Sequence, residues 1–254
     1  MTSAQPPLPW LAPGEAFPPV KEAWGTDAPA PGLLAAGGAL DVATLRHAYL
    51  QGVFPWYSAG QPILWWSPDP RMVLQTDAFK LHRSLRKTLQ NFVADAQCEV
   101  RFDTAFSDVI TACASSPRVG QSGTWILPEM VRAYTALHRA GIAHSIETWI
   151  DGELVGGLYC VGLGRAVFGE SMFTRVPDAS KIALAALVAF CRAHQIPQID
   201  CQQNTSHLAS LGAREIPRNV FGAKVKQQAA LPGPVWQFKP VYWSELLLQP
   251  VAPA

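Results

Sequence analysis

The hydrophobic pattern of residues 144–202 changes its period twice, and this change limits the folds that the chain can adopt. Three segments have the alternation and the flanking turn residues of consecutive strands, namely His144–Ile150, Glu153–Val161 and Arg165–Met172. Residues 178–194 then form an apolar helical segment, and Gln198–Gln202 is a further strand. We predict an antiparallel meander and one helical crossover, which places residues 198–202 parallel to the last strand of the meander.

The rest of the chain has weaker patterns, and residues 1–31 are rich in proline, which favours an extended segment. Helical spacing or capping residues predict helices over Val42–Gln51, Leu81–Phe92, Ala105–Ala114, Pro128–Arg139 and His207–Gly212. Short strands are expected at Met72–Leu74 and from Arg214 to Pro217. We place a domain boundary near residue 80, which gives a small N-terminal domain over 1–80 and a larger domain over 81–254.

The expected fold class is therefore α+β, with a mainly antiparallel sheet and helices in the larger domain. One helical crossover near the centre of such a sheet resembles the GNAT acyltransferase architecture. Likeness of fold does not establish chemistry.

Composition excludes several classes of protein. Of the 254 residues, 49% are hydrophobic and 15% are charged, so the chain can bury a sizeable core. The formal net charge is +1, and any contact with nucleic acid must come from a local patch. The five cysteines have no CxxC spacing, so we expect neither a metal site nor a disulfide framework. Residues 1–10 lack the features of a signal peptide, and the longest apolar run is too short to cross a membrane, so we expect a cytoplasmic protein.

Three polar side chains could form a reaction centre. Glu170 lies on the third strand of the meander, and Asp200 and Gln202 lie on the strand after the crossover helix. Period two puts Asp200 and Gln202 on the same face, and Glu170 can approach that face if the strands are neighbours. A carboxylate and an amide in one pocket could orient and deprotonate an attacking amine. Spacing alone is equally compatible with edge residues that meet solvent or backbone.

A basic cluster precedes the first helix of the larger domain and continues into it. Lys80, Arg83 and Lys87 are spaced to share one helix face, with Arg86 beside them. Such a cluster suits contacts with phosphates, although a solvated helix face has the same appearance. Aromatic side chains could likewise stack on bases, line an apolar pocket or pack in a core: Phe54, Trp56, Tyr57, Trp65, Trp66 and Trp125.

A set of longer motifs resembles the bacterial leucyl/phenylalanyl-tRNA–protein transferase family over roughly residues 15–222. The motifs are Gly32–Ala35 with Gly37-Gly38, Phe54-Pro55-Trp56, Trp65–Arg71 (WWSPDPR), Thr124-Trp125-Ile126, Ala143-His144-Ser145, Leu154–Tyr159, Gly169–Phe173 (GESMF), Ala179-Ser180-Lys181, Ile199–Gln202 (IDCQ), His207-Leu208 and Ser210–Ala213. The runs WWSPDPR, GESMF and IDCQ in this order are highly specific.

The resemblance implies a two-domain aminoacyltransferase whose larger domain is GNAT-like. It implies transfer of Leu or Phe from leucyl-tRNA or phenylalanyl-tRNA to proteins that begin with Arg or Lys, which directs those proteins to an N-degron (N-end rule) degradation route. Neither a metal nor a coenzyme is implied, because the aminoacyl ester of the tRNA is already activated. We further expect a monomer that does not bind membranes.

The resemblance also assigns roles to residues. It implies that Asp200 helps to remove a proton from the attacking amine, that Gln202 relays or orients it, and that Glu170 binds a substrate ammonium or holds the geometry of the site. The remaining assignments are an apolar aminoacyl pocket (Leu158, Leu184, Leu187, Ile199), aromatics near the terminal adenosine (Trp65, Trp66, Trp125) and a tRNA-binding surface (Lys80, Arg83, Arg86, Lys87).

Two positions depart from the pattern of the family. Cys160 stands where glycine is usual, which could narrow the neighbouring strand surface, and Cys191 stands where relatives often have an aromatic residue, which could enlarge the pocket. An acyl-CoA-dependent acetyltransferase is the alternative enzyme, but it needs a glycine-rich loop before the crossover helix, and residues 174–180 lack glycine and contain Pro177. A tRNA-binding protein without catalysis is the alternative outside enzymes.

Overall fold

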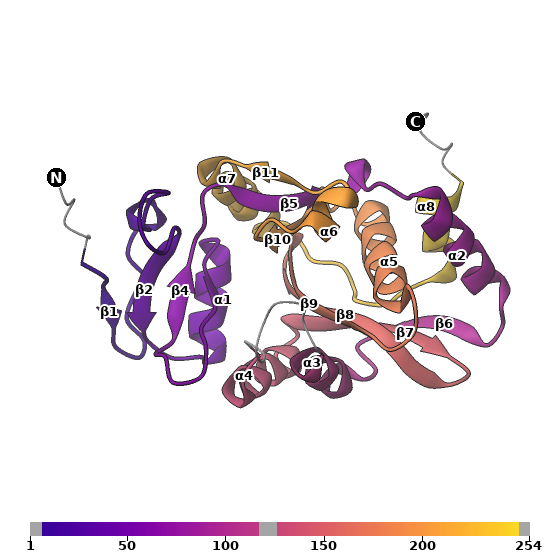
Figure 1. The fold of residues 1–254 in the computed structure, drawn as a ribbon, viewed down its shortest axis with the longest axis horizontal. Coiled ribbons are helices and arrows are strands. Elements are labelled where there is room, and N and C mark those ends of the chain that lie inside the picture. Colours follow the sequence, from indigo (N-terminus) through magenta and orange to yellow (C-terminus); the bar gives the residue numbers. More distant parts are fainter. Residues whose placement is uncertain (1–6, 117–125, 249–254) are drawn as a thin grey trace.

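The computed structural model describes residues 7–116 and 126–248, which form two sheets with helices around them (Figure 1). A four-stranded sheet has the order β1-β2-β4-β3 and consists of β1 (Trp10–Leu11), β2 (Leu33–Gly37), β3 (Phe54–Pro55) and β4 (Leu64–Trp66). Together with α1 (Val42–Leu50) and the 3-10 turn η1 (Val20–Glu22), this sheet makes the lobe at the left of Figure 1.

The second sheet has seven strands in the order β11-β5-β10-β9-β8-β7-β6. Its strands are β5 (Arg71–Gln75), β6 (Cys98–Phe102), β7 (Ala143–Ile150), β8 (Glu153–Leu163), β9 (Ala166–Thr174), β10 (Gln198–Gln202) and β11 (Arg214–Ile216). The remaining helices are α2 (Arg83–Ala94), α3 (Phe106–Ser115), α4 (Pro128–Arg139), α5 (Ala179–Ala193), α6 (Ser206–Ser210), α7 (Arg218–Ala229) and α8 (Ser244–Leu247), with 3-10 turns η2 (Thr76–Ala78) and η3 (Pro240–Trp243).

The predicted meander and crossover are confirmed. β7, β8 and β9 pair antiparallel, α5 follows, and β10 returns parallel to β9. The parallel pairing is short, because only Ile199 with Val167 and Asp200 with Phe168 are in register. The pairing does not continue beyond these residues, and the polar side chains of Glu170 and Gln202 follow it on the two strands.

Helices cover both faces of the larger sheet (Figure 1). α5 packs on one face, where its buried residues join those of β8 and α2 in one hydrophobic cluster. α3 and α4 pack on the other face, and their cluster continues into the four-stranded sheet through residues such as Tyr49, Trp65 and Tyr134. The two sheets therefore share one continuous apolar core on the α3–α4 side.

The local signals at helix ends act as predicted in two places. The carboxylate of Asp41 accepts a hydrogen bond from the backbone N–H of Thr44 at 2.9 Å, which caps α1. Pro128 occupies the first turn of α4, and Gly141 follows the helix with a φ of +69°.

The domain boundary near residue 80 stays a prediction. Residues 71–75 form β5, which lies inside the seven-stranded sheet between β11 and β10, so the part of the chain before residue 80 contributes strands to both sheets. The predicted start of the basic helix is wrong, because α2 begins at Arg83. The chain before it is fixed by other bonds: the N–H of Lys80 donates to the carbonyl of Leu211, and the ring of His82 bonds to the carbonyl of Ser210.

The sequence analysis missed further elements of the fold, including α7 and α8. Neither the four-stranded sheet nor β6 was expected, because short or partly polar strands have little period of their own.

Among the helices that the structure describes, none is long and apolar enough to cross a membrane.

Gly156 provides a test of how α5 packs on the sheet. A Cβ atom at Gly156 would lie 2.5 Å from the Cβ of Ala179 and 2.9 Å from its carbonyl carbon, at the start of α5. We expect Gly156→Ala to lower the free energy of unfolding by about 1–3 kcal/mol through overpacking, as measured by urea unfolding. Gly25→Ala is the matched control, because a Cβ there meets no described atom within 4 Å. Equal stability of the two variants would contradict this packing.

Candidate active site

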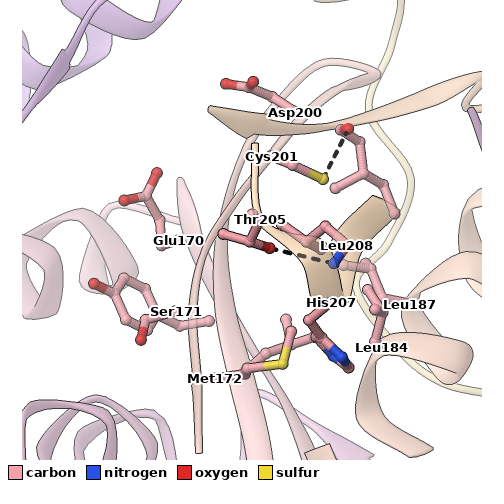
Figure 2. A pocket seen from close by; sticks show the side chains of 14 residues that line it. Glu170, Ser171, Met172, Leu184, Leu187, Asp200, Cys201, Thr205, His207 and Leu208 are labelled. Carbon is pink, nitrogen blue, oxygen red and sulfur yellow. Dashed lines mark hydrogen bonds between the residues drawn. The ribbon is translucent and has the colours of Figure 1, made fainter. Parts of the chain in front are cut away.

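A cavity of about 260 Å³ lies where β9 and β10 part (Figure 2). Its walls come from β8, β9, α5, β10, Thr205 and α6. The lining residues are Leu158, Tyr159, Gly169, Glu170, Ser171, Met172, Leu184, Leu187, Ile199, Asp200, Cys201, Thr205, His207 and Leu208. The structure therefore brings Glu170 and Asp200 to one cavity, together with the four apolar residues that the sequence analysis assigned to a pocket.

The cavity has an apolar side and a polar side. Leu184, Leu187 and Leu208 lie together in Figure 2, and the Glu170 carboxylate lies on the opposite side. A ligand with an apolar side chain and a polar end fits such a division, because each part meets groups of its own kind.

Glu170 is at the centre of a hydrogen-bond network from three other elements. Its Oε1 accepts from the hydroxyl of Tyr49 on α1 at 2.7 Å and from Nε2 of Gln202 on β10 at 2.9 Å. Its Oε2 accepts from the hydroxyl of Tyr134 on α4 at 3.3 Å, and the two tyrosine hydroxyls also bond to each other. Burial raises the pKa of both tyrosines well above the ordinary value, so both remain protonated donors.

The environment of Glu170 changes its acidity. Burial, with a smaller contribution from the charge of Asp200, raises the pKa of Glu170 to about 8. The hydrogen bonds from Tyr49 and Tyr134 and the charge of Arg71 act in the opposite direction. Near neutral pH this carboxyl group can therefore exist in either protonation state, as a group that exchanges protons with an amine requires.

Asp200 is held by an arginine that the sequence analysis did not single out. Nε and Nη2 of Arg71 donate to Oδ1 and Oδ2 of Asp200 at 2.8 and 2.6 Å, and both side chains are 1% exposed. In Figure 2 the Asp200 carboxylate points away from Leu187 and Leu208. Both oxygens of Asp200 are thus engaged by the guanidinium in a bidentate pair.

The expected alternation of Asp200 and Gln202 is interrupted. The pairing of β10 with β5 shifts register between these residues, and Gln202 has a φ of +62°. Asp200 consequently turns toward Arg71 on β5, and Gln202 turns toward Glu170 on β9. The prediction that period two gives the two side chains a common face is therefore wrong, although both lie near Glu170.

Arg71, Tyr49 and Tyr134 are the residues of this site that sequence reasoning missed. Arg71 stands within the WWSPDPR motif at the start of an apolar strand, and a charged side chain in such a strand needs a buried partner. Tyr49 and Tyr134 occupy apolar helix faces, where a tyrosine is normally read as core.

The tryptophans do not gather at the cavity. Trp65 is fully buried in the four-stranded sheet, where its indole N–H donates to the carbonyl of Gly37 at 2.8 Å. The indole N–H of Trp66 donates to the carbonyl of Trp56 at 2.6 Å. The described residues that line the cavity include neither Trp65 nor Trp66, and their placement beside the terminal adenosine stays a prediction. Trp125 lies outside the described residues.

The basic cluster is only partly a helix face. Arg83 and Lys87 are exposed on α2, and Lys80 is exposed on the segment before it. Nη1 of Arg86 donates to the carbonyl of Leu247 at 3.0 Å, so this side chain holds the C-terminal segment. Lys80, Arg83 and Lys87 are exposed, and a phosphate contact by the cluster stays a prediction.

Cys160 and Cys191 are fully buried in the cluster between α5 and the sheet. The cavity-lining residues of the described chain do not include either cysteine. Any effect of these two departures on the cavity must therefore pass through neighbouring side chains.

Comparison with known proteins identifies close relatives over nearly the whole chain. Two family models match, one described as leucyl/phenylalanyl-tRNA protein transferase over residues 73–226 and one as its N-terminal domain over residues 38–69. A protein of Polaromonas sp. named leucyl/phenylalanyl-tRNA–protein transferase is 68% identical over 95% of this chain and 94% of its own length. Proteins with the same name from Albidiferax ferrireducens and Leptothrix cholodnii are 63% and 60% identical over 97% and 94% of this chain, and over 97% and 95% of their own lengths.

Glu170 predicts a measurable dependence of stability on pH. An unfolded glutamate ionises near pH 4.5, whereas the pKa of folded Glu170 is about 8. Between these values the folded state keeps a proton that the unfolded state releases, so this residue makes the free energy of unfolding fall as pH rises, by at most about 1.4 kcal/mol per pH unit. Urea unfolding at several pH values should show this slope reduced in Glu170→Gln. It should persist in Glu153→Gln, a control at an exposed position. Identical slopes in all three proteins would contradict the raised pKa.

Proposed function

This chain belongs to the leucyl/phenylalanyl-tRNA–protein transferase family, and we propose that its cavity binds the aminoacyl end of a leucyl- or phenylalanyl-tRNA and transfers the amino acid to a protein N-terminus. One observation carries the proposal: an apolar cavity of about 260 Å³ has a partly buried carboxyl group on its polar side. Leucine and phenylalanine esters have the matching halves, an apolar side chain and an ammonium group.

The apolar walls select the side chain of the donor. Leu158, Leu184, Leu187 and Ile199 line the cavity and are each at most 4% exposed. A polar amino acid would bury its side-chain donors or acceptors against these walls without partners, which costs binding free energy. Leucine or phenylalanine has no such cost and gains free energy from burial of its apolar side chain.

The polar side holds the amines. Glu170 binds the ammonium of the donor amino acid, and Tyr49 and Tyr134 fix the orientation of its carboxyl group. Gln202, which donates to Glu170, orients the incoming amine of the acceptor beside it. Arg71 occupies both oxygens of Asp200, so Asp200 contributes its negative charge. Oδ1 of Asp200 also accepts the backbone N–H of Gln202, which holds Gln202 in position.

The reaction needs no cofactor in this scheme. The neutral acceptor amine attacks the ester carbonyl carbon, a new amide bond forms, and the bond between that carbon and the ribose oxygen breaks. The amine loses one proton and the leaving ribose hydroxyl gains one, so protons balance. The site lowers the barrier by holding both amines close to the ester.

The specific partners form the finer part of the proposal. Acceptors begin with Arg or Lys, whose positive side chain suits a site with two carboxyl groups, and the product enters an N-degron route. We also propose that the protein acts in the cytoplasm as a monomer. The parting of β9 and β10 beside a crossover helix supports a GNAT arrangement of the seven-stranded sheet.

An acyl-CoA-dependent reaction fits the structure poorly. The loop before α5 would have to hold a pyrophosphate with backbone amides. Asp178 precedes the helix there with a φ of +65°, and its carboxylate pairs with Lys181 at 2.7 Å. A carboxylate at that point repels a phosphate.

Aminoacyl transfer is tested with purified protein and labelled phenylalanyl-tRNA or leucyl-tRNA. We expect transfer to a peptide that begins with Arg, because its free α-amine is the nucleophile, and none to the same peptide acetylated at its N-terminus. Peptide-bound label, separated from tRNA, is the measurement. Absence of transfer from either tRNA would overturn the proposal in favour of a binding protein.

The basic cluster makes a separate prediction about tRNA affinity. Replacing Arg83 and Lys87 by alanine removes two exposed cations from α2 and should lower the slope of log affinity against log salt by roughly one to two. Filter binding of charged tRNA at several salt concentrations gives this slope. Arg139→Ala is the control, since this exposed arginine ends α4 on the other side of the sheet (Figure 1). An unchanged slope in the α2 variant would place the tRNA elsewhere.

A further inference from the structure

The side chain of Arg71 is charged, yet it is buried and held in place by its neighbours. Its side chain is 1% exposed at the start of β5. The guanidinium carbon lies 4.7 Å from the ring centre of Phe54 and 4.7 Å from that of Phe221, so the group packs over two aromatic rings. Phe54 belongs to the four-stranded sheet and Phe221 to α7, so three parts of the fold meet at this residue.

The nitrogens of Arg71 have two targets. Nε and Nη2 donate to the two oxygens of Asp200, and Nη1 donates to the carbonyl of Gly52 at 3.1 Å. Gly52 has a φ of +73°, and a Cβ there would lie 2.9 Å from the ring of Phe221. The loop after α1 is thus shaped to bring its carbonyl to the guanidinium.

Asp200 passes this constraint on to Gln202. Oδ1 of Asp200 also accepts the backbone N–H of Gln202 at 2.9 Å, across the register shift in β10. Gln202 has a φ of +62°, a left-handed conformation that a glutamine rarely adopts without support. In that conformation its side-chain amide reaches Oε1 of Glu170 at 2.9 Å.

We propose that Arg71 is a positioning residue for aminoacyl transfer, which acts through Asp200 to hold Gln202 in the left-handed conformation that aims its amide at Glu170. This inference rests on the proposed function and assigns a role to a residue that touches neither the donor nor the acceptor. Gly52 and Phe54 both contact Arg71, so the N-terminal part of the chain also helps to fix the geometry of Gln202.

The chemistry of the side chain explains why arginine stands here. A guanidinium offers parallel N–H donors that match a carboxylate, and its flat face packs between rings. A lysine in the same place would present one compact ammonium group, which can neither donate to both oxygens in a plane nor stack on the rings of Phe54 and Phe221.

The test uses a charge-free replacement of the pair. Arg71→Met alone leaves Asp200 buried without its cation and is expected to destabilise the protein strongly. The double variant Arg71→Met with Asp200→Leu removes both charges and keeps apolar side chains of similar length, a change that buried ion pairs often tolerate. Thermal unfolding checks that it is folded before its kinetics are measured.

Transfer rates are then compared in wild type, in Gln202→Ala, in the double variant and in the triple variant that combines all three changes. We expect the double variant to lose at least tenfold in single-turnover rate, with donor affinity changed less than threefold. If the pair acts through Gln202, the triple variant should be no slower than Gln202→Ala, within twofold. The inference would be overturned if the rate losses of the double variant and of Gln202→Ala multiply in the triple variant. It would also be overturned if the double variant reacts at the wild-type rate.

A matched control and a second measurement separate structural from positioning effects. Glu99→Leu with Arg101→Met removes an exposed ion pair on the edge strand β6 and should leave the rate unchanged. In protein labelled with ¹⁵N-glutamine, the Gln202 side-chain signal, assigned by its loss in Gln202→Ala, should move in the double variant to the position of an exposed glutamine. An unmoved signal refutes the positioning role whatever the enzyme activity is. If wild type itself transfers nothing, the proposed function fails while this measurement still judges the role of Arg71.

Discussion

The ion pair between Arg71 and Asp200 lies where the loop after α1, β5, β10 and α7 come together. Removing two charges from water is costly, and their attraction offsets the cost only when geometry is good and the remaining donors are used. Here both carboxylate oxygens are engaged, a third nitrogen reaches Gly52, and two aromatic rings pack against the guanidinium. A pair of this kind has few alternative arrangements, so it specifies how the four-stranded sheet meets the larger one.

The cavity depends on a different property of the same strand. β10 is parallel to β9 for two residue pairs and then leaves it, while its other edge remains bonded to β5. Parallel neighbours that part expose strand ends with side chains from both, and the crossover helix α5 supplies apolar residues behind them. The chemical division of the site follows from this geometry. The leucines and Ile199 come from packed elements, and Glu170 comes from β9 beyond its pairing with β10, where tyrosines of α1 and α4 reach it.

Sequence patterns predicted the meander, the crossover helix and the parallel return of residues 198–202, because each depends on periods and turns that lie close together in the chain. The four-stranded sheet escaped prediction, since strands such as Phe54–Pro55 are too short to have a period. The placement of Met72–Leu74 in the larger sheet escaped it too, because nothing local distinguishes an edge strand of one sheet from a central strand of another.

The sequence by itself determined the family, the candidate acid and amide groups, and the apolar residues of the cavity wall. Motifs such as GESMF and IDCQ are read from adjacent residues. Tertiary structure alone decided what these groups contact. The bulge that separates Asp200 from Gln202 arises from pairing with β5, and the partners of Glu170 and Asp200 come from positions more than a hundred residues away, Tyr49 and Arg71. Burial and hydrogen bonding to distant residues set the pKa of Glu170, and no local pattern carries that information.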